Sequence, residues 1–254
     1  MKNILFLLFA VLGSCTQLPK NDLQKENLKG NVKSVLLSEF EGIEKFGEIT
    51  KGSLAYKYKY IYNDKGNLLE EQRFESDGNL SYKYLFFYDE KGNRNRVEKH
   101  YYPSNNSLFL IDKYIYDNKG NMVEENSYDT DGSLSTKSKY VYDNKGNQIE
   151  GKNYNSDGSF RGKYEFFYDD EGNRIREEFY NNDGSFDRKV EYNYNDKGNV
   201  LERKDYIGRS IDTREYVYTN FLRENWVKRE SRFDGASSYT KEISYTEREI
   251  EYFD

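Results

Sequence analysis

The stretch YIYDNKGNMVEENSYDTDGSLSTKSKYVYDNKGN at residues 114–147 decides the fold. It holds two copies of a Tyr-x-Tyr-Asp phrase that ends in Gly-Asn, with an Asp-Gly pair between them. Such pairs, flanked by alternating residues, are typical of tight hairpin turns, because glycine adopts a positive φ without steric cost. The stretch therefore predicts strand, turn, strand and turn, with neighbouring strands antiparallel.

The same unit repeats along most of the chain. Gly120 and Gly146 are 26 residues apart (146 − 120), and an Asp-Gly turn at Gly132 lies between them. A turn glycine of the first kind recurs at Gly66, Gly92, Gly120, Gly146, Gly172 and Gly198, and one of the second kind at Gly78, Gly132, Gly158 and Gly184. In one unit the residues at 103–106, PSNN, replace the Asp-Gly turn. Each unit therefore predicts two strands.

These units predict an all-β fold, an elongated antiparallel meander of tandem β-hairpin repeats. Roughly 14 strands spaced about 4.8 Å apart would give a ribbon roughly 65 Å long. Strand residues alternate between faces, so Tyr140 and Tyr142 share one face and Val141 lies on the other. Because residues on both faces are apolar near the Gly-Asn turns, we expect the sheet to be twisted or curled.

The N-terminal residues, MKNILFLLFAVLGSC, combine Lys2 with an apolar run that is too short to span a membrane. Leu12-Gly13-Ser14-Cys15 resembles the bacterial lipobox, which implies a lipid on the Cys15 sulfur and acyl chains as the contact with the membrane. We expect a signal peptide over 1–14, a tether over 15–29 and one β domain over 30–254. Within that domain, 55–208 hold the regular repeats and 209–254 the C-terminal cap strands.

This beginning predicts a bacterial envelope protein. We expect the outer membrane with the body facing the periplasm, because the TQLPKND segment after the cysteine has no acidic cluster close to it that would suggest export. A location on the cell surface stays open as an alternative.

Composition excludes several classes of function. The net charge is −6 and there is no basic block, which argues against nucleic acid as a partner. One cysteine and one histidine, His100, leave no set for a Cys or His metal site or a Ser-His triad. The 26 tyrosines and 16 phenylalanines indicate a folded chain. We expect no cofactor.

Acidic residues offer two weaker chemical hypotheses. Asp129 and Asp131 in one turn suggest calcium, but the loop lacks the distal glutamate and the other oxygen ligands of a calcium-binding loop. Glutamates recur after the Gly-Asn turns and could serve in glycan hydrolysis, although a repeated carboxylate suits a partner for lysine across the sheet. These residues are Glu70, Glu124, Glu150 and Glu202. We expect no enzyme and no catalytic or metal-binding residues, and keep a glycan-acting enzyme as a remote alternative.

The Tyr-x-Tyr-Asp-x-x-Gly phrase resembles the YD repeat of the Rhs family, over about residues 55–208. The family builds hollow β-shells around toxic cargo, or spirals on cell surfaces. Here Asn follows the glycine where the family usually has Arg-Leu, the unit is longer, and no toxin domain follows. The resemblance therefore implies the sheet-building pattern and not the toxin function. The chain also resembles small bacterial repeat lipoproteins of unknown function.

The function expected from these features is a non-enzymatic envelope lipoprotein that presents a repetitive β surface for protein interaction or scaffolding. The alternative is a module that binds carbohydrate or cell wall through its aromatic rows. The residues that would form that surface are Tyr114, Tyr116, Tyr140, Tyr142, Tyr192 and Tyr194. The partner, a protein or a glycan, is not identified. Trp226, near the place of the next turn, is expected to be a cap or core residue.

Overall fold

The computed structural model describes residues 21–103, 107–208, 210–235 and 242–254. The expected signal peptide, Cys15 and the first part of the expected tether lie outside these residues. The described residues form one short helix, α1 (Asp22–Lys25), and sixteen strands. The strands are β1 (Val32–Lys45), β2 (Glu48–Tyr62), β3 (Leu68–Glu75), β4 (Leu80–Tyr88), β5 (Arg94–Tyr101), β6 (Ser107–Tyr116), β7 (Met122–Tyr128), β8 (Leu134–Tyr142), β9 (Gln148–Asn155), β10 (Phe160–Tyr168), β11 (Arg174–Tyr180), β12 (Phe186–Tyr194), β13 (Val200–Ile207), β14 (Ser210–Leu222), β15 (Asn225–Gly235) and β16 (Glu242–Tyr252).

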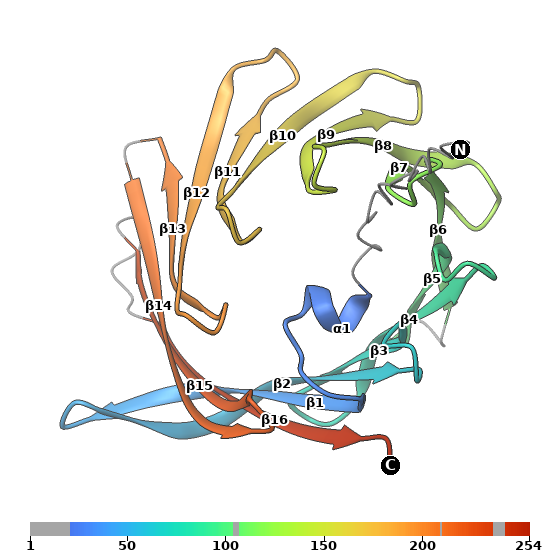
Figure 1. Cartoon of the computed structure of the whole chain (residues 1–254). Helices are drawn as coiled ribbons and strands as arrows, with labels where there is room; N and C mark the ends of the chain where they lie inside the picture. Colours follow the sequence, from blue (N-terminus) through green and yellow to red (C-terminus); the bar gives the residue numbers. More distant parts are fainter. Residues whose placement is uncertain (1–20, 104–106, 209, 236–241) are drawn as a thin grey trace, which may run out of the picture.

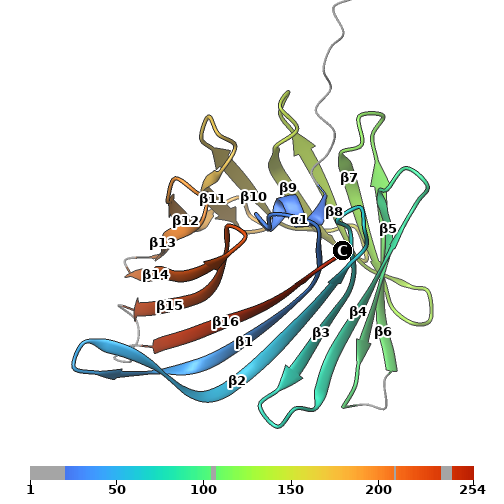
Figure 2. The same ribbon diagram turned by 60° about the horizontal axis from the view of Figure 1, so that its bottom comes forward.

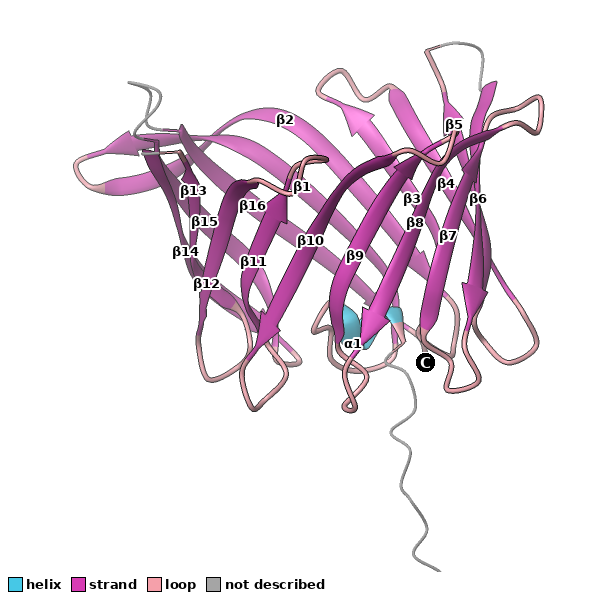
Figure 3. Cartoon of the chain, turned by 90° about the horizontal axis from the view of Figure 1, so that it is seen from above, coloured by secondary structure: helices cyan, strands magenta, loops and turns pink. Residues whose placement is uncertain are grey.

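The strands form a closed antiparallel barrel in which each pairs with its neighbours in sequence (Figures 1 and 3). Closure comes from β1, which pairs with β2 on one side and with β16 on the other. The all-β content and the antiparallel order are as expected, but the elongated open meander is wrong. An open sheet would leave the backbone groups of β1 and β16 unpaired at its two edges, and closure pairs them.

The repeated turns fold as their sequence indicates. In the β6–β7 turn, the Asp117 side chain accepts hydrogen bonds from the backbone N–H of Lys119 at 2.8 Å and of Asn121 at 2.9 Å. Gly120 has a φ of 84°, a value that favours glycine. The Gly-Asn turns, from β2–β3 to β12–β13, lie at one end of the barrel, and the Asp-Gly turns lie at the other.

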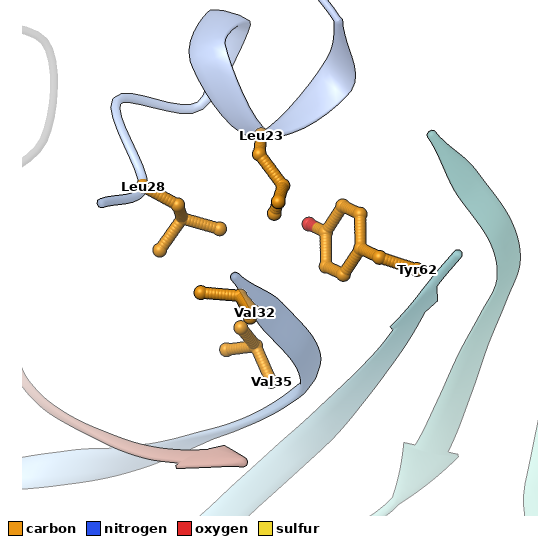
Figure 4. Close-up of a cluster of buried hydrophobic side chains, with 5 residues drawn as sticks. All are labelled: Leu23, Leu28, Val32, Val35 and Tyr62. Carbon is orange, nitrogen blue, oxygen red and sulfur yellow. The ribbon is translucent and has the colours of Figure 1, made fainter. Parts of the chain in front are cut away.

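The N-terminal residues 21–28, which we call the plug, lie inside the barrel at the end that carries the Gly-Asn turns (Figure 1). We call this the plug end. Asn21 begins α1 with a reciprocal cap, in which its side chain accepts from the Gln24 backbone and its own backbone N–H donates to the Gln24 side chain. Leu23 and Leu28 then pack on Val32, Val35 and Tyr62 (Figure 4). This cluster fixes the plug to the inner wall of β1 and β2.

Two long hairpins break the even height of the wall. β1 and β2 extend beyond the neighbouring strands at the end away from the plug (Figure 2). β14 is also longer than the repeat strands. The expected cap strands of 209–254, here β14 to β16, therefore belong to the wall and bring its last strand to β1.

Candidate functional site

The tyrosine rows line the inside of the barrel. Tyr60 and Tyr62 line a cavity beside the plug, and residues paired across antiparallel strands share a face. Tyr60 pairs with Glu71, which pairs with Tyr84, which in turn pairs with Lys99. These residues on β2 to β5 therefore all face the lumen. The same face holds the expected surface residues Tyr114, Tyr116, Tyr140, Tyr142, Tyr192 and Tyr194, all half-buried.

The last tyrosine of each phrase ties one unit to the one before it. The Tyr142 hydroxyl donates to the Met122 carbonyl at 2.8 Å, and Tyr194 donates to that of Arg174 at 2.8 Å. The equivalent bond joins three further pairs, Tyr116 to Arg94, Tyr168 to Gln148 and Tyr218 to Val200. The Tyr88 hydroxyl lies beside the Leu68 carbonyl but is shared with Asp22, as described below. Burial raises the pKa of Tyr116 to about 12, so its hydroxyl keeps the donated proton at neutral pH.

Other lumenal tyrosines bond to carboxylates. Tyr140 donates to Glu125 at 2.6 Å and Tyr192 donates to Glu177 at 3.0 Å. Burial raises the pKa of Tyr140, and the bond to Glu125 raises it further. Many of the hydroxyls on the lumenal wall, including those of Tyr116, Tyr142 and Tyr194, therefore already have a hydrogen-bond partner.

Asp22 holds the plug in place through one buried carboxylate. It accepts from the Leu68 backbone N–H at 3.0 Å and from the Tyr88 hydroxyl at 2.7 Å. Arg94 and Lys25 pair with its other oxygen at 3.0 and 3.3 Å. Burial opposes the charge, but Arg94, Lys25 and these hydrogen bonds together hold the pKa of Asp22 below its usual value.

The plug also bonds to turns at two places on the rim. The Asn21 amide donates to the Lys65 carbonyl in the β2–β3 turn at 2.9 Å. The Asn27 amide donates to the Lys197 carbonyl in the β12–β13 turn, also at 2.9 Å. Because these turns belong to separate parts of the wall, the plug reaches across the lumen.

A cavity of about 420 Å³ lies between the plug and the wall. Its apolar lining includes Leu28, Val35, Leu37, Leu68 and Phe86, and its polar lining includes Tyr60, Tyr62, Glu71, Arg94 and Arg248. This size and this mixture of surfaces suit a small organic molecule. A hollow of about 410 Å³ beside Phe87 and Arg96 lies on the outer wall and is more open to solvent.

Arg248 is the cation of this cavity that has no carboxylate partner among the described residues. Its guanidinium lies 3.5 Å from the centre of the Trp226 ring, and that of Arg229 lies 5.1 Å from it. The Arg248 Nε is buried without a hydrogen-bond partner. Burial and the neighbouring Arg229 lower the pKa of Arg248 to about 10.

Sequence reasoning missed this group. Trp226 is 6% exposed, in agreement with the expected cap or core position. The sequence feature that could have identified Arg248 is the segment EREIEYFD at 247–254. Because side chains alternate between the two faces of a strand, Arg248, Ile250 and Tyr252 share one face of β16. That face could not be assigned to a lumen without knowledge that β16 pairs with β1.

The outer wall is charged at mid-height. Lysine–glutamate pairs cover it at 2.7–3.2 Å: Lys83–Glu70, Lys137–Glu124, Lys152–Glu150, Lys163–Glu165, Lys189–Glu191 and Lys204–Glu202. The recurrent glutamates Glu70, Glu124, Glu150 and Glu202 thus lie outside the lumen, each paired with a lysine. Among the described residues, no group of three or more His, Cys, Asp or Glu could hold a metal ion.

Apolar and aromatic residues flank this charged belt. Near the plug end, Ile115, Val141 and Val217 are 50%, 47% and 51% exposed. Toward the other end, lysines lie over the rings of Tyr128, Tyr154, Tyr180 and Tyr206. The described part of the chain has no helix long and apolar enough to cross a membrane.

No protein-family model and no curated protein matches the sequence. Among solved structures, a porin-like protein from Bacteroides uniformis is similar, with a TM-score of 0.58 and 11% identity over 87% of this chain and 96% of that one. A porin-like protein from Bacteroides vulgatus gives a TM-score of 0.37 at 14% identity, covering 89% and 99% of the two chains. The TcdB2-TccC3 structure gives 0.34 at 14% identity, covering 75% of this chain and 10% of that one.

The first of these comparisons shows a shared barrel fold, and the TM-scores of 0.37 and 0.34 are too low to support an argument. The Rhs resemblance is therefore supported only in part. The expected scaffold lipoprotein with a repetitive exposed surface is wrong, because the repeats close into a barrel like that of a porin-like protein. The carbohydrate-binding alternative has no better support, since its six tyrosines face the lumen.

Proposed function

We propose that this protein is a hollow, water-facing barrel of the bacterial envelope that binds a small organic molecule at the plugged end of its lumen. The observation that carries the proposal is the division between the two faces of the wall. The outer face is covered at mid-height by lysine–glutamate pairs, and the inner face holds the tyrosine rows of the repeat and the cavity.

The outer face argues against a barrel embedded in lipid over its height. A membrane-spanning barrel needs an outward apolar band about 25 Å tall, and a lysine at mid-membrane costs about 2–4 kcal/mol. Here the exposed apolar ring near the plug end is about two residues deep, because Leu69, Ile149, Ile175 and Leu201 lie next to the layer of Ile115 and Val141. Two residues along a strand span roughly 7 Å, so the ring covers a small part of that height.

The inner face supports binding. A barrel of about sixteen strands is wide enough for an aqueous interior, unlike one of eight strands, whose interior side chains can fill. The plug narrows one end, and it adds Leu28 and Asp22 to the lining of the cavity. A small molecule there would touch both the plug and the wall.

The envelope location rests on the N-terminal sequence and on the fold shared with a porin-like protein. We propose attachment to the outer membrane through a lipid on Cys15. Labelling cells with a radioactive fatty acid tests this, because the wild-type chain would take up the label and a Cys15→Ser chain would not.

The decisive test of the barrel uses residues 21–254, which contain the plug and every described strand. We expect this chain to be monomeric and β-rich without detergent, and to give no conductance when added to planar lipid bilayers. A chain that stays in solution only with detergent, or that opens stable channels, would instead identify a porin-like pore.

A cavity-filling variant tests the binding site. Leu37→Trp would occupy the cavity, whereas Leu36→Trp adds the same ring to the outer face of the same strand. Native mass spectrometry of barrels purified from bacterial cells should show a small bound molecule in the wild type and in Leu36→Trp, and none in Leu37→Trp. Wild-type barrels without any bound molecule in repeated preparations would count against lumenal binding.

A further inference from the structure

We propose that Arg248 is an anion-binding residue and that the cavity takes a small organic acid with a single carboxylate and an apolar body. This deepens the proposed function and rests on it, since it names the chemical class of the ligand. The group that points to it is a guanidinium in the cavity wall that has no ion-pair partner among the described residues.

The neighbourhood of Arg248 orients it for this task. The indole of Trp226 lies against it at 3.5 Å, and the Trp226 ring is in turn packed on Tyr218 at 5.4 Å between ring centres. Stacking covers a face of the guanidinium and leaves its N–H groups at the edge free to donate. A planar carboxylate can accept two of them at once.

Arg229 reinforces the positive charge without competing for the ligand. Its guanidinium donates to the Thr246 hydroxyl at 3.2 Å and lies 3.8 Å from the Glu39 carboxylate. Arg229 is therefore already bonded to residues of the barrel wall. Burial and proximity to Arg229 make the positive charge of Arg248 unfavourable, and Glu26 of the plug offsets this only in part. A bound anion would offset it further.

The other charges of the cavity limit the ligand to one negative charge. Arg94 and Lys25 already form ion pairs with Asp22. Glu26 and Glu71 also line the cavity and would repel a polyanion. A phosphorylated ligand with two charges therefore fits less well than a monocarboxylate.

The apolar lining accounts for the rest of the ligand. Leu28, Val35, Leu37 and Phe86 face the same cavity as Arg248. Burial of a hydrocarbon body against them is favourable at about 25 cal/mol per Å². The expected ligand is amphipathic, with its carboxylate at β16 and its body toward β1 and β4.

The test uses the single tryptophan of the chain as the reporter, because Trp226 touches Arg248. The barrel of residues 21–254 is titrated with 4-phenylbutyrate and, in parallel, with uncharged 4-phenylbutanol and with inorganic phosphate. We expect a saturable change in tryptophan fluorescence with phenylbutyrate, with at least tenfold weaker binding of the alcohol and of phosphate. Calorimetry of the same titrations gives a readout independent of the fluorophore.

Variants separate the role of Arg248 from general effects. Arg248→Gln should weaken phenylbutyrate binding at least tenfold and leave binding of the alcohol unchanged, and Arg248→Lys should give an intermediate loss. Arg176→Gln is the matched control, since Arg176 lies over Phe167 at 3.8 Å on the outer wall, and it should bind as the wild type does. Far-UV circular dichroism and thermal melting confirm that each variant is folded.

Three outcomes would overturn the proposal: no saturable phenylbutyrate binding to a folded barrel, equal binding by Arg248→Gln, or equal binding of the alcohol and the acid. Binding of phosphate in preference to the acid would assign Arg248 to a different anion and would overturn the monocarboxylate class. None of these results would make the barrel insoluble or conductive, so they are distinct from failure of the proposed function.

Discussion

Glu71 is a lumenal carboxylate in an unfavourable place. Burial raises its pKa first, and the neighbouring Glu26 of the plug raises it further, against a smaller opposing effect of Arg94. Because the folded state binds the proton more tightly than the unfolded state, this residue lowers stability as the pH rises above about 4.5, its ordinary value.

Glu71→Gln should therefore stabilise the barrel at pH 7–8, by on the order of 2 °C in Tm. The gain should vanish below about pH 4, where the glutamate is protonated in both states. Thermal melting followed by circular dichroism across this pH range provides the measurement.

The matched control is Glu124→Gln on the outer wall, for which the sign is opposite. A hydrogen bond from Asn126 lowers the pKa of Glu124, and the bond to Lys137 lowers it further. This carboxylate stabilises the fold above its unfolded pKa, so its loss should lower the Tm at neutral pH. Equal shifts in both variants would contradict the assigned environments.

The plug is an element held by its contacts with the wall, and not by its own helical stability. A helix of four residues is too short to be stable alone. Asp22 supplies it with contacts to Leu68, Tyr88 and Arg94, which belong to three different strands. The plug is therefore stable only through its contacts with the wall.

Asp22→Asn should undock the plug, at a cost on the order of 3 kcal/mol, because it leaves Arg94 without its charge partner. Amide hydrogen exchange at residues 22–28 should accelerate while exchange in the repeat strands stays slow. Lowering the pH should reproduce the effect in the wild type, since the pKa of Asp22 is below its usual value and the contact is lost only as the pH falls through it.

Asp77→Asn, in an exposed turn at the other end, is the control. It should leave exchange in the plug unchanged. Undisturbed exchange at 22–28 in Asp22→Asn would show that the hydrophobic cluster around Leu23 suffices to hold the plug.

At the scale of the whole molecule, closure is the decisive property. The seam between β1 and β16 pairs Leu36 with Glu249 and Val35 with Ile250. Across it, Lys33 lies 2.7 Å from Glu251, and the Thr246 hydroxyl, fully buried, donates to Glu39 at 2.7 Å. The seam thus has both backbone pairing and specific side-chain bonds.

Cysteines at Leu36 and Glu249 test closure directly. Residues paired across antiparallel strands have Cα atoms about 4.5–5.5 Å apart, within reach of a disulfide. Leu36→Cys with Glu249→Cys in the 21–254 chain should therefore form an intramolecular disulfide under mild oxidation, seen by mass spectrometry of the digest. Leu36→Cys with Lys139→Cys on β8 should form none within one chain, and an open sheet would give none in either pair.

The repeat by itself determined the local structure of this protein. Each Gly-Asn and Asp-Gly pair restricts its own turn through short-range bonds such as that of Asp117 to Asn121, and alternation places Tyr140 and Tyr142 on one face. The tertiary structure alone decided which face is the inside, because a sheet whose residues are partly apolar on both sides can curl either way or stay open. Pairing of β1 with β16 closed the sheet with the tyrosines on the lumenal face. It also brought Arg248, near the C-terminal end of the described residues, next to Leu37 and the plug. These contacts join residues more than two hundred positions apart, so no local pattern in the sequence could specify them.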